Sequence, residues 1–209
     1  MAGQAVVADV VVPAIPGLPI HVIFGEAIDV VKFAEKRWER WGPDGSPGLK
    51  SGVDEAHRRL SPDEPARARV ALDAAQAAHT HWLLTVDGTA HTALRARSTK
   101  VLAELVSTLD YLLDDGIQDV NDDRFAQVNA LHAESGESAD AQALALMDYA
   151  ALAKPLQAQL DGLGEFDGAM IDEAPLLAAQ LRELPPVALR QSPEAKVALA
   201  DRNAKINQL

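Results

Sequence analysis

The sequence predicts an all-α protein: an antiparallel helical bundle with two long central helices and a short non-helical arm at its N-terminus. Two observations predict this fold. The 209 residues include 38 alanines and 26 leucines but only nine aromatic residues, and alanine and leucine favour helices, whereas branched and aromatic residues favour strands. In addition, apolar residues recur every three to four positions through most of the chain, as on one face of an α-helix.

Residues 1–19 are expected to form the arm, and residues 20–209 a single helical domain. Val10, Val11 and Val12 belong to a branched stretch that prefers extended backbone, and prolines follow it at positions 13, 16 and 19. The arm is expected either to lie over its own bundle or to reach onto a neighbouring molecule. In the second case the three valines are partner contacts.

A first helix is expected from about residue 20 to 41. Seven apolar residues in this range are spaced alternately by four and three positions, which places them on one stripe. Gly42-Pro43 ends the helix. Residues 42–52, with four glycines and two prolines, are predicted to be a linker.

The end of this first helix mixes cations with tryptophans. One interpretation is that core tryptophans are flanked by solvated cations, which are favourable at a helix C-terminus. The other is a binding edge formed by Phe33, Arg37 and Trp41, which are spaced by four residues. Arg37 and Trp41 are therefore candidate partner contacts.

Two long helices are expected over residues 62–115, at the centre of the bundle. Ser61-Pro62-Asp63-Glu64 has the composition of a capping box that starts a helix. Gly88 then interrupts the pattern, and Thr89 is expected to cap the second helix. A helical hairpin is the expected arrangement, and a single interrupted rod is the alternative.

The rest of the chain is expected to form shorter helices. Ser138 and Ser192 are each placed to cap a helix, and Pro155 is expected to kink or divide a helix near Ala153 because it removes a backbone donor. The apolar pattern of the last helix reaches Leu209, so the natural chain is expected to continue beyond this residue. The expected helices lie at residues 121–133, 138–163, 170–184 and 192–209.

The net charge of −12 is concentrated in one segment: residues 110–173 hold 15 acidic and 2 basic groups. Such a surface repels nucleic acid, so nucleic-acid binding is not expected, whereas a cation or a basic partner would be attracted. The alternative is a solvated face whose carboxylates cap and end helices. The acidic residues singled out as candidate partner contacts are Asp114, Asp115, Asp119, Asp122 and Asp123.

The histidines do not form an obvious metal site. His79 and His81 are two residues apart, and on a helix this spacing turns their side chains to opposite sides. His79 falls on the apolar stripe and is expected in the core. His57, His91 and His132 stand beside polar residues and are expected to be solvated.

The other candidate catalytic and cofactor motifs lack residues that the motif requires. Residues 119–123 have alternating oxygen ligands like a calcium loop, but Arg124 and Ala130 stand where such a loop needs glycine and glutamate. The chain contains no cysteine, no phosphate-binding loop and no Gly-x-Ser-x-Gly. No catalytic residue, metal ligand or cofactor is therefore assigned.

The leading hypothesis is a non-catalytic helical scaffold that mediates protein–protein contacts or self-association. The alternative is a helical-bundle enzyme or a metal- or small-molecule-binding protein with a site between helices. A third hypothesis is a membrane-active helical protein, although prolines and polar residues interrupt the apolar start of the chain, which also lacks the basic region of a signal peptide. A soluble, cytoplasmic protein is therefore expected.

Overall fold

The computed structural model describes residues 13–15, 17–40, 63–114, 123–134, 137–162, 166–184 and 192–209. These residues form helices and connecting turns without any strand, so the predicted all-α fold is confirmed. The helices are α1 (Ile20–Arg40), α2 (Glu64–Asp87), α3 (Thr89–Asp114), α4 (Asp123–Glu134), α5 (Ala139–Ala153), the short 3₁₀ helix η2 (Lys154–Leu156), α6 (Gln157–Gly162), α7 (Ala169–Arg182) and α8 (Pro193–Ile206).

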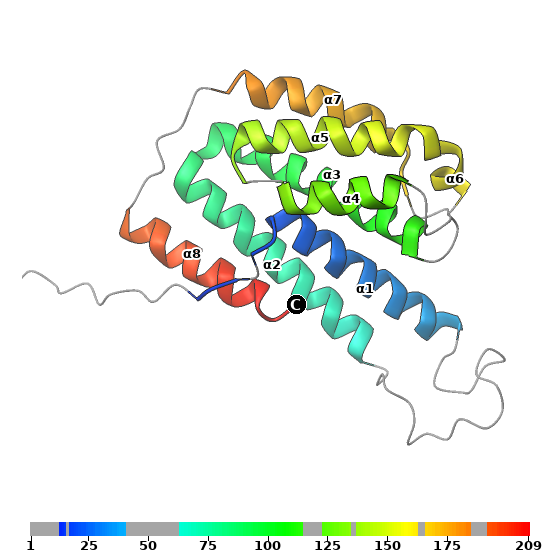
Figure 1. The fold of residues 1–209 in the computed structure, drawn as a ribbon. Coiled ribbons are helices and arrows are strands. Elements are labelled where there is room, and N and C mark those ends of the chain that lie inside the picture. Colours follow the sequence, from blue (N-terminus) through cyan, green and yellow to red (C-terminus); the bar gives the residue numbers. More distant parts are fainter. Residues whose placement is uncertain are drawn as a thin grey trace, which may run out of the picture.

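The bundle has two sides with α3 between them (Figure 1). On one side α1 packs against α3, and α2 contacts both α1 and α8. On the other side α5 and α7 pack against each other and against α3, with α4 beside α5. The long helices α2 and α3 form the expected hairpin, and α3 is the more central of the two.

Gly88 makes the hairpin turn possible. Its φ of 75° lies in the left-handed region that only glycine adopts without strain. Thr89 is the first residue of α3, so Gly88 precedes the helix where Thr89 was expected to do so. The start of α2 also differs from the expectation: it begins at Glu64, after Asp63, and Ser61 and Pro62 lie outside the described residues.

Most of the other helix boundaries are explained by residues close to them in sequence. The Ser138 and Ser192 hydroxyls accept hydrogen bonds, each 3.1 Å long, from the backbone N–H groups of Ala141 and Ala195, so both predicted caps are confirmed. Pro155 lies in η2, directly after the end of α5. This break is the one predicted for a proline that cannot donate to the preceding turn.

Helix α1 is buried on more than one face. Ile20, Phe24 and Val31 of the predicted stripe are buried, but so is Val22, which lies off that stripe. The reason is that α1 packs between α2 and α3. It approaches α3 closely at Gly25, where a Cβ atom would overlap the Val106 side chain.

The last part of the N-terminal arm lies along α8 of the same chain. The Asn203 side-chain amide donates to the Pro13 carbonyl at 2.7 Å, and the Asn207 amide donates to the Ala14 carbonyl at 2.8 Å. Ile15 then packs against the core between α1 and α2. Val10, Val11 and Val12 lie outside the described residues.

Candidate interaction groove

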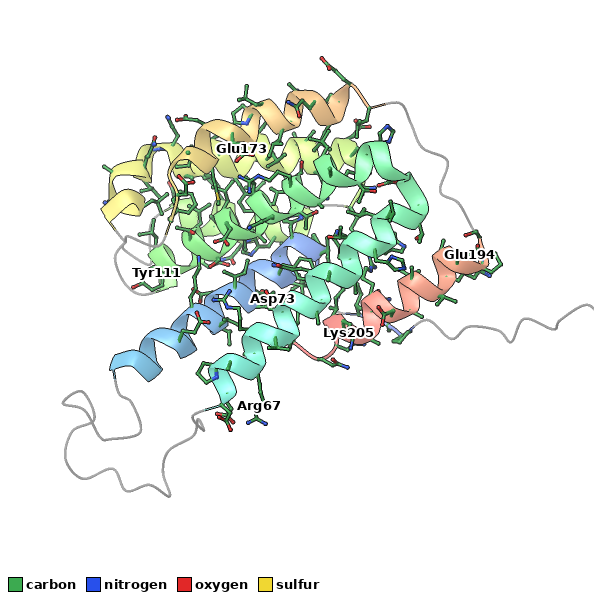
Figure 2. The ribbon with its side chains drawn as sticks, turned by 180° about the vertical axis from the view of Figure 1, so that it is seen from behind. Arg67, Asp73, Tyr111, Glu173, Glu194 and Lys205 are labelled. Atoms are coloured by element: carbon green, nitrogen blue, oxygen red, sulfur yellow. The ribbon has the colours of Figure 1, made fainter. Side chains whose placement is uncertain are left out.

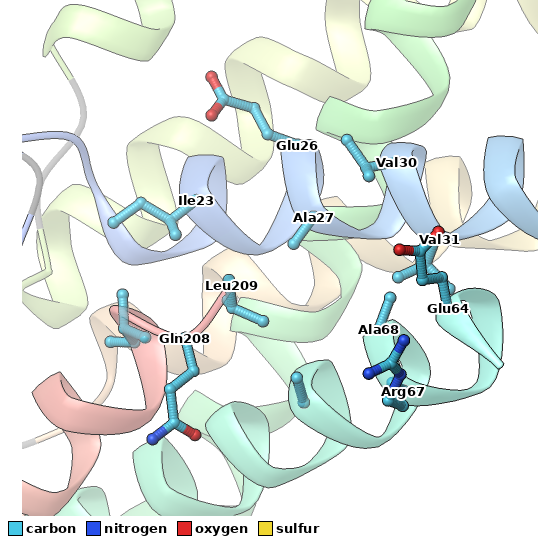
Figure 3. Close-up of a pocket in the computed structure, with 12 residues that line it drawn as sticks. Ile23, Glu26, Ala27, Val30, Val31, Glu64, Arg67, Ala68, Gln208 and Leu209 are labelled. Atoms are coloured by element: carbon cyan, nitrogen blue, oxygen red, sulfur yellow. The ribbon is translucent and has the colours of Figure 1, made fainter. Parts of the chain in front are cut away.

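A groove of about 640 Å³ runs between α1, α2 and the C-terminal end of α8. Its lining is mainly apolar. Figure 3 shows Ala27 on α1 and Ala68 on α2 pointing toward each other across it. The apolar side chains that line it include Ile23, Val30 and Val31 from α1, Ala71 from α2, and Ile206 and Leu209 at the end of α8.

Small residues create this groove. Alanines at three positions on the facing sides of α1 and α2 leave space that longer side chains would fill. At the rim, the side chain of Val30 remains 62% exposed and that of Leu209 44% exposed. The groove therefore presents apolar surface to solvent at its edge as well as on its floor.

Charged groups stand at the edges of the groove. Glu64 and Arg67 lie at the N-terminal end of α2 (Figure 3), and Arg67 is on the exposed side of that helix (Figure 2). Glu26 lines the groove from α1, and partial burial raises the pKa of its carboxyl group. The groove thus combines an apolar floor with both signs of charge at its margins.

Ion pairs fix the walls of the groove. Arg69 on α2 donates two hydrogen bonds to the carboxylate of Glu35 on α1, at 3.0 and 2.6 Å. Lys32 on α1 pairs with Glu104 on α3, with 2.8 Å between Nζ and Oε2. These contacts define the spacing of α1 from α2 and α3, although partly exposed pairs add little stability by themselves.

A buried polar cluster holds α8 in place at the other wall. Arg202 is 4% exposed and donates to the Glu137 carboxylate at 3.0 Å and to the Asn203 side-chain oxygen at 3.0 Å. Its guanidinium carbon lies 4.3 Å from the ring centroid of Trp82 on α2. Arg202 thereby joins α8 to α2 and to the segment that precedes α5.

A second arginine extends this cluster into α3. Arg95 pairs with Asp87 and donates to the Glu137 carbonyl and, at 3.4 Å, to the Gln142 side chain. Gln142 in turn donates to the Thr99 hydroxyl at 3.0 Å. Buried polar side chains need hydrogen-bond partners, and the side chains of this cluster supply them to one another. The cluster therefore has a structural role.

His79 lies beneath α8 and is 2% exposed, as expected for a core histidine. Its ring centroid is 5.7 Å from those of Phe24 and Trp82. Burial lowers the pKa of His79 to about 3, and the positive charges of Arg202 and Arg95 add to this effect. The imidazole is therefore neutral at pH 7.

A second histidine, His21 on α1, is fully buried and was not assigned to the core from the sequence. Its ring lies 6.0 Å from that of Tyr149 on α5, which in turn lies 5.9 Å from His132 on α4. Burial, assisted by His132, lowers the pKa of His21 to about 4. The apolar run around His21 was the available signal, because its neighbours on the helix are core residues.

The expectation that His132 is solvated is wrong. Its side chain is 13% exposed and lies 3.7 Å from the carboxylate of Asp110 on α3. The polar neighbours of His132 in sequence do not reveal that the ring faces α3 and α5. Asp110 is likewise partly buried.

The structure describes three of the predicted partner contacts. Arg37 is in α1, Asp114 is the last residue of α3, and Asp123 is the exposed first residue of α4. Asp123 is not among the residues that line the groove. The candidates that lie outside the described residues are Val10, Val11, Val12, Trp41, Asp115, Asp119 and Asp122.

Within the described ranges, no group of three or more histidine, aspartate or glutamate side chains is arranged to hold a metal ion. His79 is buried whereas His81 is exposed, which confirms that they point to different sides of α2. Among the same residues, no helix combines the length and the apolar character needed to cross a membrane.

Comparisons with known proteins return no match to a family model, to a curated protein or to a solved structure.

Proposed function

We propose that this chain is a helical interaction protein that binds an apolar segment of a partner protein in the groove between α1 and α2. The observation that carries the proposal is the apolar groove of about 640 Å³, whose exposed rim includes Val30 and Leu209. Solvent-exposed apolar surface inside a concave site is typical of protein and ligand interfaces.

An amphipathic helix is the partner segment that best suits the shape. The lining residues of α1 extend from Ile23 to Val31, a rise of about 12 Å or just over two helical turns. A docked helix would place two or three apolar side chains over the alanines of α1 and α2, as in other helix-in-groove complexes. Its polar face would remain in solvent beside Glu64 and Arg67.

The test uses peptides selected from a displayed library of helical sequences against the immobilised full chain. Affinities of the selected peptides are then measured for Ala71→Trp, which fills the groove, and for Val30→Asp, which places a charge at its rim. We expect each change to weaken binding by about tenfold or more, because Ala71→Trp removes the space for the peptide and Val30→Asp places a charge against its apolar side chains. Ala77→Trp, on an exposed part of α2 outside the groove, is the matched control and should leave affinity unchanged.

Peptides that bind all four proteins equally would contradict the proposal. Circular dichroism and thermal unfolding of each variant identify a loss of binding that results from misfolding. Val30→Asp is informative in this respect because its side chain is largely exposed in the unbound protein.

A second candidate function is the binding of a small apolar molecule. The groove volume lies within the range of small-ligand pockets, which is roughly 300 to 1,000 Å³. Anilinonaphthalene sulfonate, a fluorescent apolar probe, distinguishes this function from the first. Dye binding that Ala71→Trp abolishes, in a protein that yields no groove-dependent peptide, would favour the small-molecule function.

A further inference from the structure

A second surface lies on the opposite side of α3, on the outer faces of α5 and α7. Leu144 and Met147 on α5 are 57% and 38% exposed, and Leu176 on α7 is 65% exposed. Alanines and a proline continue the apolar surface between them. The outer apolar face consists of Leu144, Met147, Ala151, Pro175, Leu176 and Ala179, all exposed.

The register of the two helices makes this face continuous. Lys154, which directly follows α5, pairs with Asp172 near the start of α7 at 2.7 Å, and the two helices lie side by side (Figure 1). Met147 is seven residues before Lys154, and Ala179 is seven residues after Asp172. Because the helices run antiparallel, these two positions lie at the same level, with Leu176 less than one turn away.

Carboxylates outnumber cations beside the outer apolar face. Asp140 and Asp148 lie on α5, Asp172 lies near the start of α7, and Glu183 directly follows α7. The exposed cations on the same side are Lys154, which pairs with Asp172, and Arg182 at the end of α7. Helices α4 to α7, with η2 between α5 and α6, together carry seven acidic and three basic residues, whereas α1, α2 and α8 together carry nine of each. The negative charge of the described helices is thus concentrated on the side of the bundle that carries this face.

We propose that the outer apolar face binds a basic amphipathic helix of a partner protein. The apolar stripe of that helix would lie along the outer faces of α5 and α7, over Met147 and Leu176. Lysine or arginine on its flanks would then face Asp140 and Asp148 on α5 and Glu183 at the end of α7. The groove between α1 and α2 lies on the other side of the bundle, so this surface is independent of the function proposed above.

Charge also decides between this partner and the other candidates. A second copy of the chain would bring two acidic faces together, and like charges across an interface oppose association. Nucleic acid and anionic lipid are repelled for the same reason. The excess of carboxylates therefore selects a cationic partner, and the apolar stripe selects one with an amphipathic helix.

The test measures binding of three synthetic helical peptides to the full chain by fluorescence anisotropy. One peptide has a leucine stripe flanked by lysines, the second has the same stripe flanked by glutamates, and the third has the lysines with the leucines scrambled. We expect only the first to bind measurably, and we expect its affinity to fall as salt screens the charges. Equal binding of the first two peptides, or of the first and third, would overturn the proposal.

Variants then locate the peptide on the surface. Met147→Ser combined with Leu176→Ser should weaken binding about tenfold or more by removing the exposed apolar contacts. Asp140→Asn combined with Asp148→Asn should weaken it mainly at low salt. The matched control is Val70→Ser combined with Val197→Ser, which removes exposed valines from α2 and α8 and should leave binding unchanged. An effect of the control pair equal to that of Met147 and Leu176 would contradict this location.

Discussion

At the scale of single residues, two buried histidines make the protein sensitive to acid. His21 and His79 are each 2% exposed or less, and burial is the main reason that their pKa values fall to about 4 and about 3. Neither ring has a hydrogen-bond partner among the described residues. A proton on either imidazole therefore adds a charge that the interior does not compensate.

The direction of the pH effect follows from proton binding. In the unfolded chain both histidines have a pKa near 6.5 and take up protons before the folded protein does. The contribution of the two neutral histidines to the free energy of unfolding is thus fully present above about pH 6.5. It is lost as the pH falls toward 4. Each histidine should lower the free energy of unfolding by about 1.4 kcal/mol per pH unit in this window.

Urea unfolding at pH 7.5 and pH 5.0 measures this effect. We expect His79→Phe to lose part of the pH dependence, because phenylalanine keeps a ring beside Phe24 and Trp82 without binding a proton. His81→Phe, at an exposed position on the same helix, is the control. A pH dependence that is identical in the wild type and His79→Phe would show that His79 does not titrate as described.

Gly25 provides a second test at the residue scale. Gly25→Ala should destabilise the protein by about 1–3 kcal/mol, because the added Cβ overlaps Val106 and must push α1 away from α3. Gly17→Ala is the matched control, since a Cβ at that position has no neighbour within 4 Å. Thermal unfolding distinguishes the two, and equal stability of both variants would contradict the close approach of α1 and α3.

At the scale of the elements, α8 depends on its polar contacts. It packs mainly on α2, and Arg202 supplies its links to Glu137 and Trp82. Arg202→Ala leaves the partly buried Glu137 carboxylate without this cation, which should cost about 3 kcal/mol or more. Since the C-terminal end of α8 forms one wall of the groove, this substitution should also weaken binding there.

Hydrogen exchange measures this change helix by helix. In Arg202→Ala the amides of α8 should exchange faster, whereas those of α5 and α7 should keep their protection, because local opening follows the contacts that are lost. Lys196→Ala, an exposed change in the same helix, should alter neither. Uniformly faster exchange across all helices would mean that α8 does not open separately.

The elements also show how far local sequence determines the structure. The apolar spacing from Ile20 onward, the serines before α5 and α8, and Pro155 act through neighbouring residues, and the sequence predicts their consequences closely. The environment of His132 depends instead on Asp110 and Tyr149, which belong to other helices. Arg202 and Glu137 are 65 residues apart in sequence, so no local pattern indicates that they meet.

The groove was not predictable for the same reason. Its floor combines alanines of α1 and α2 with the end of α8, and alanine spacing on one helix does not specify which helix will lie opposite. The excess of negative charge in residues 110–173 was visible in the sequence. Its concentration on one side of the bundle becomes apparent only when α4 to α7 are placed together.

At the scale of the whole molecule, the two proposed surfaces lie on sides of different charge. The side formed by α1, α2 and α8 is balanced, whereas α4 to α7 are acidic. Two partners of different chemistry could then bind at the same time, which is the arrangement expected of a scaffold. Binding at the groove should depend weakly on salt, and binding at the outer apolar face should depend on it strongly.

Charge crowding also affects the stability of the whole molecule. Raising the salt concentration from about 10 mM to about 150 mM shortens the range of electrostatic repulsion from about 30 Å to about 8 Å. With a net charge of −12, we expect the midpoint of thermal unfolding to rise over this interval. A fall would indicate that the ion pairs contribute more than the repulsion among the carboxylates.

The most direct test of the proposed function is a methyl NMR titration of the full chain with a peptide selected against it. The proposal predicts that the methyl signals of Ile23, Val30, Val31 and Ile206, which line the groove, shift together and saturate at one affinity. The methyl signals of Leu144 and Leu176 should stay in place. Saturable binding that leaves the four groove residues unshifted would contradict the claim that this groove is where the protein receives its partner.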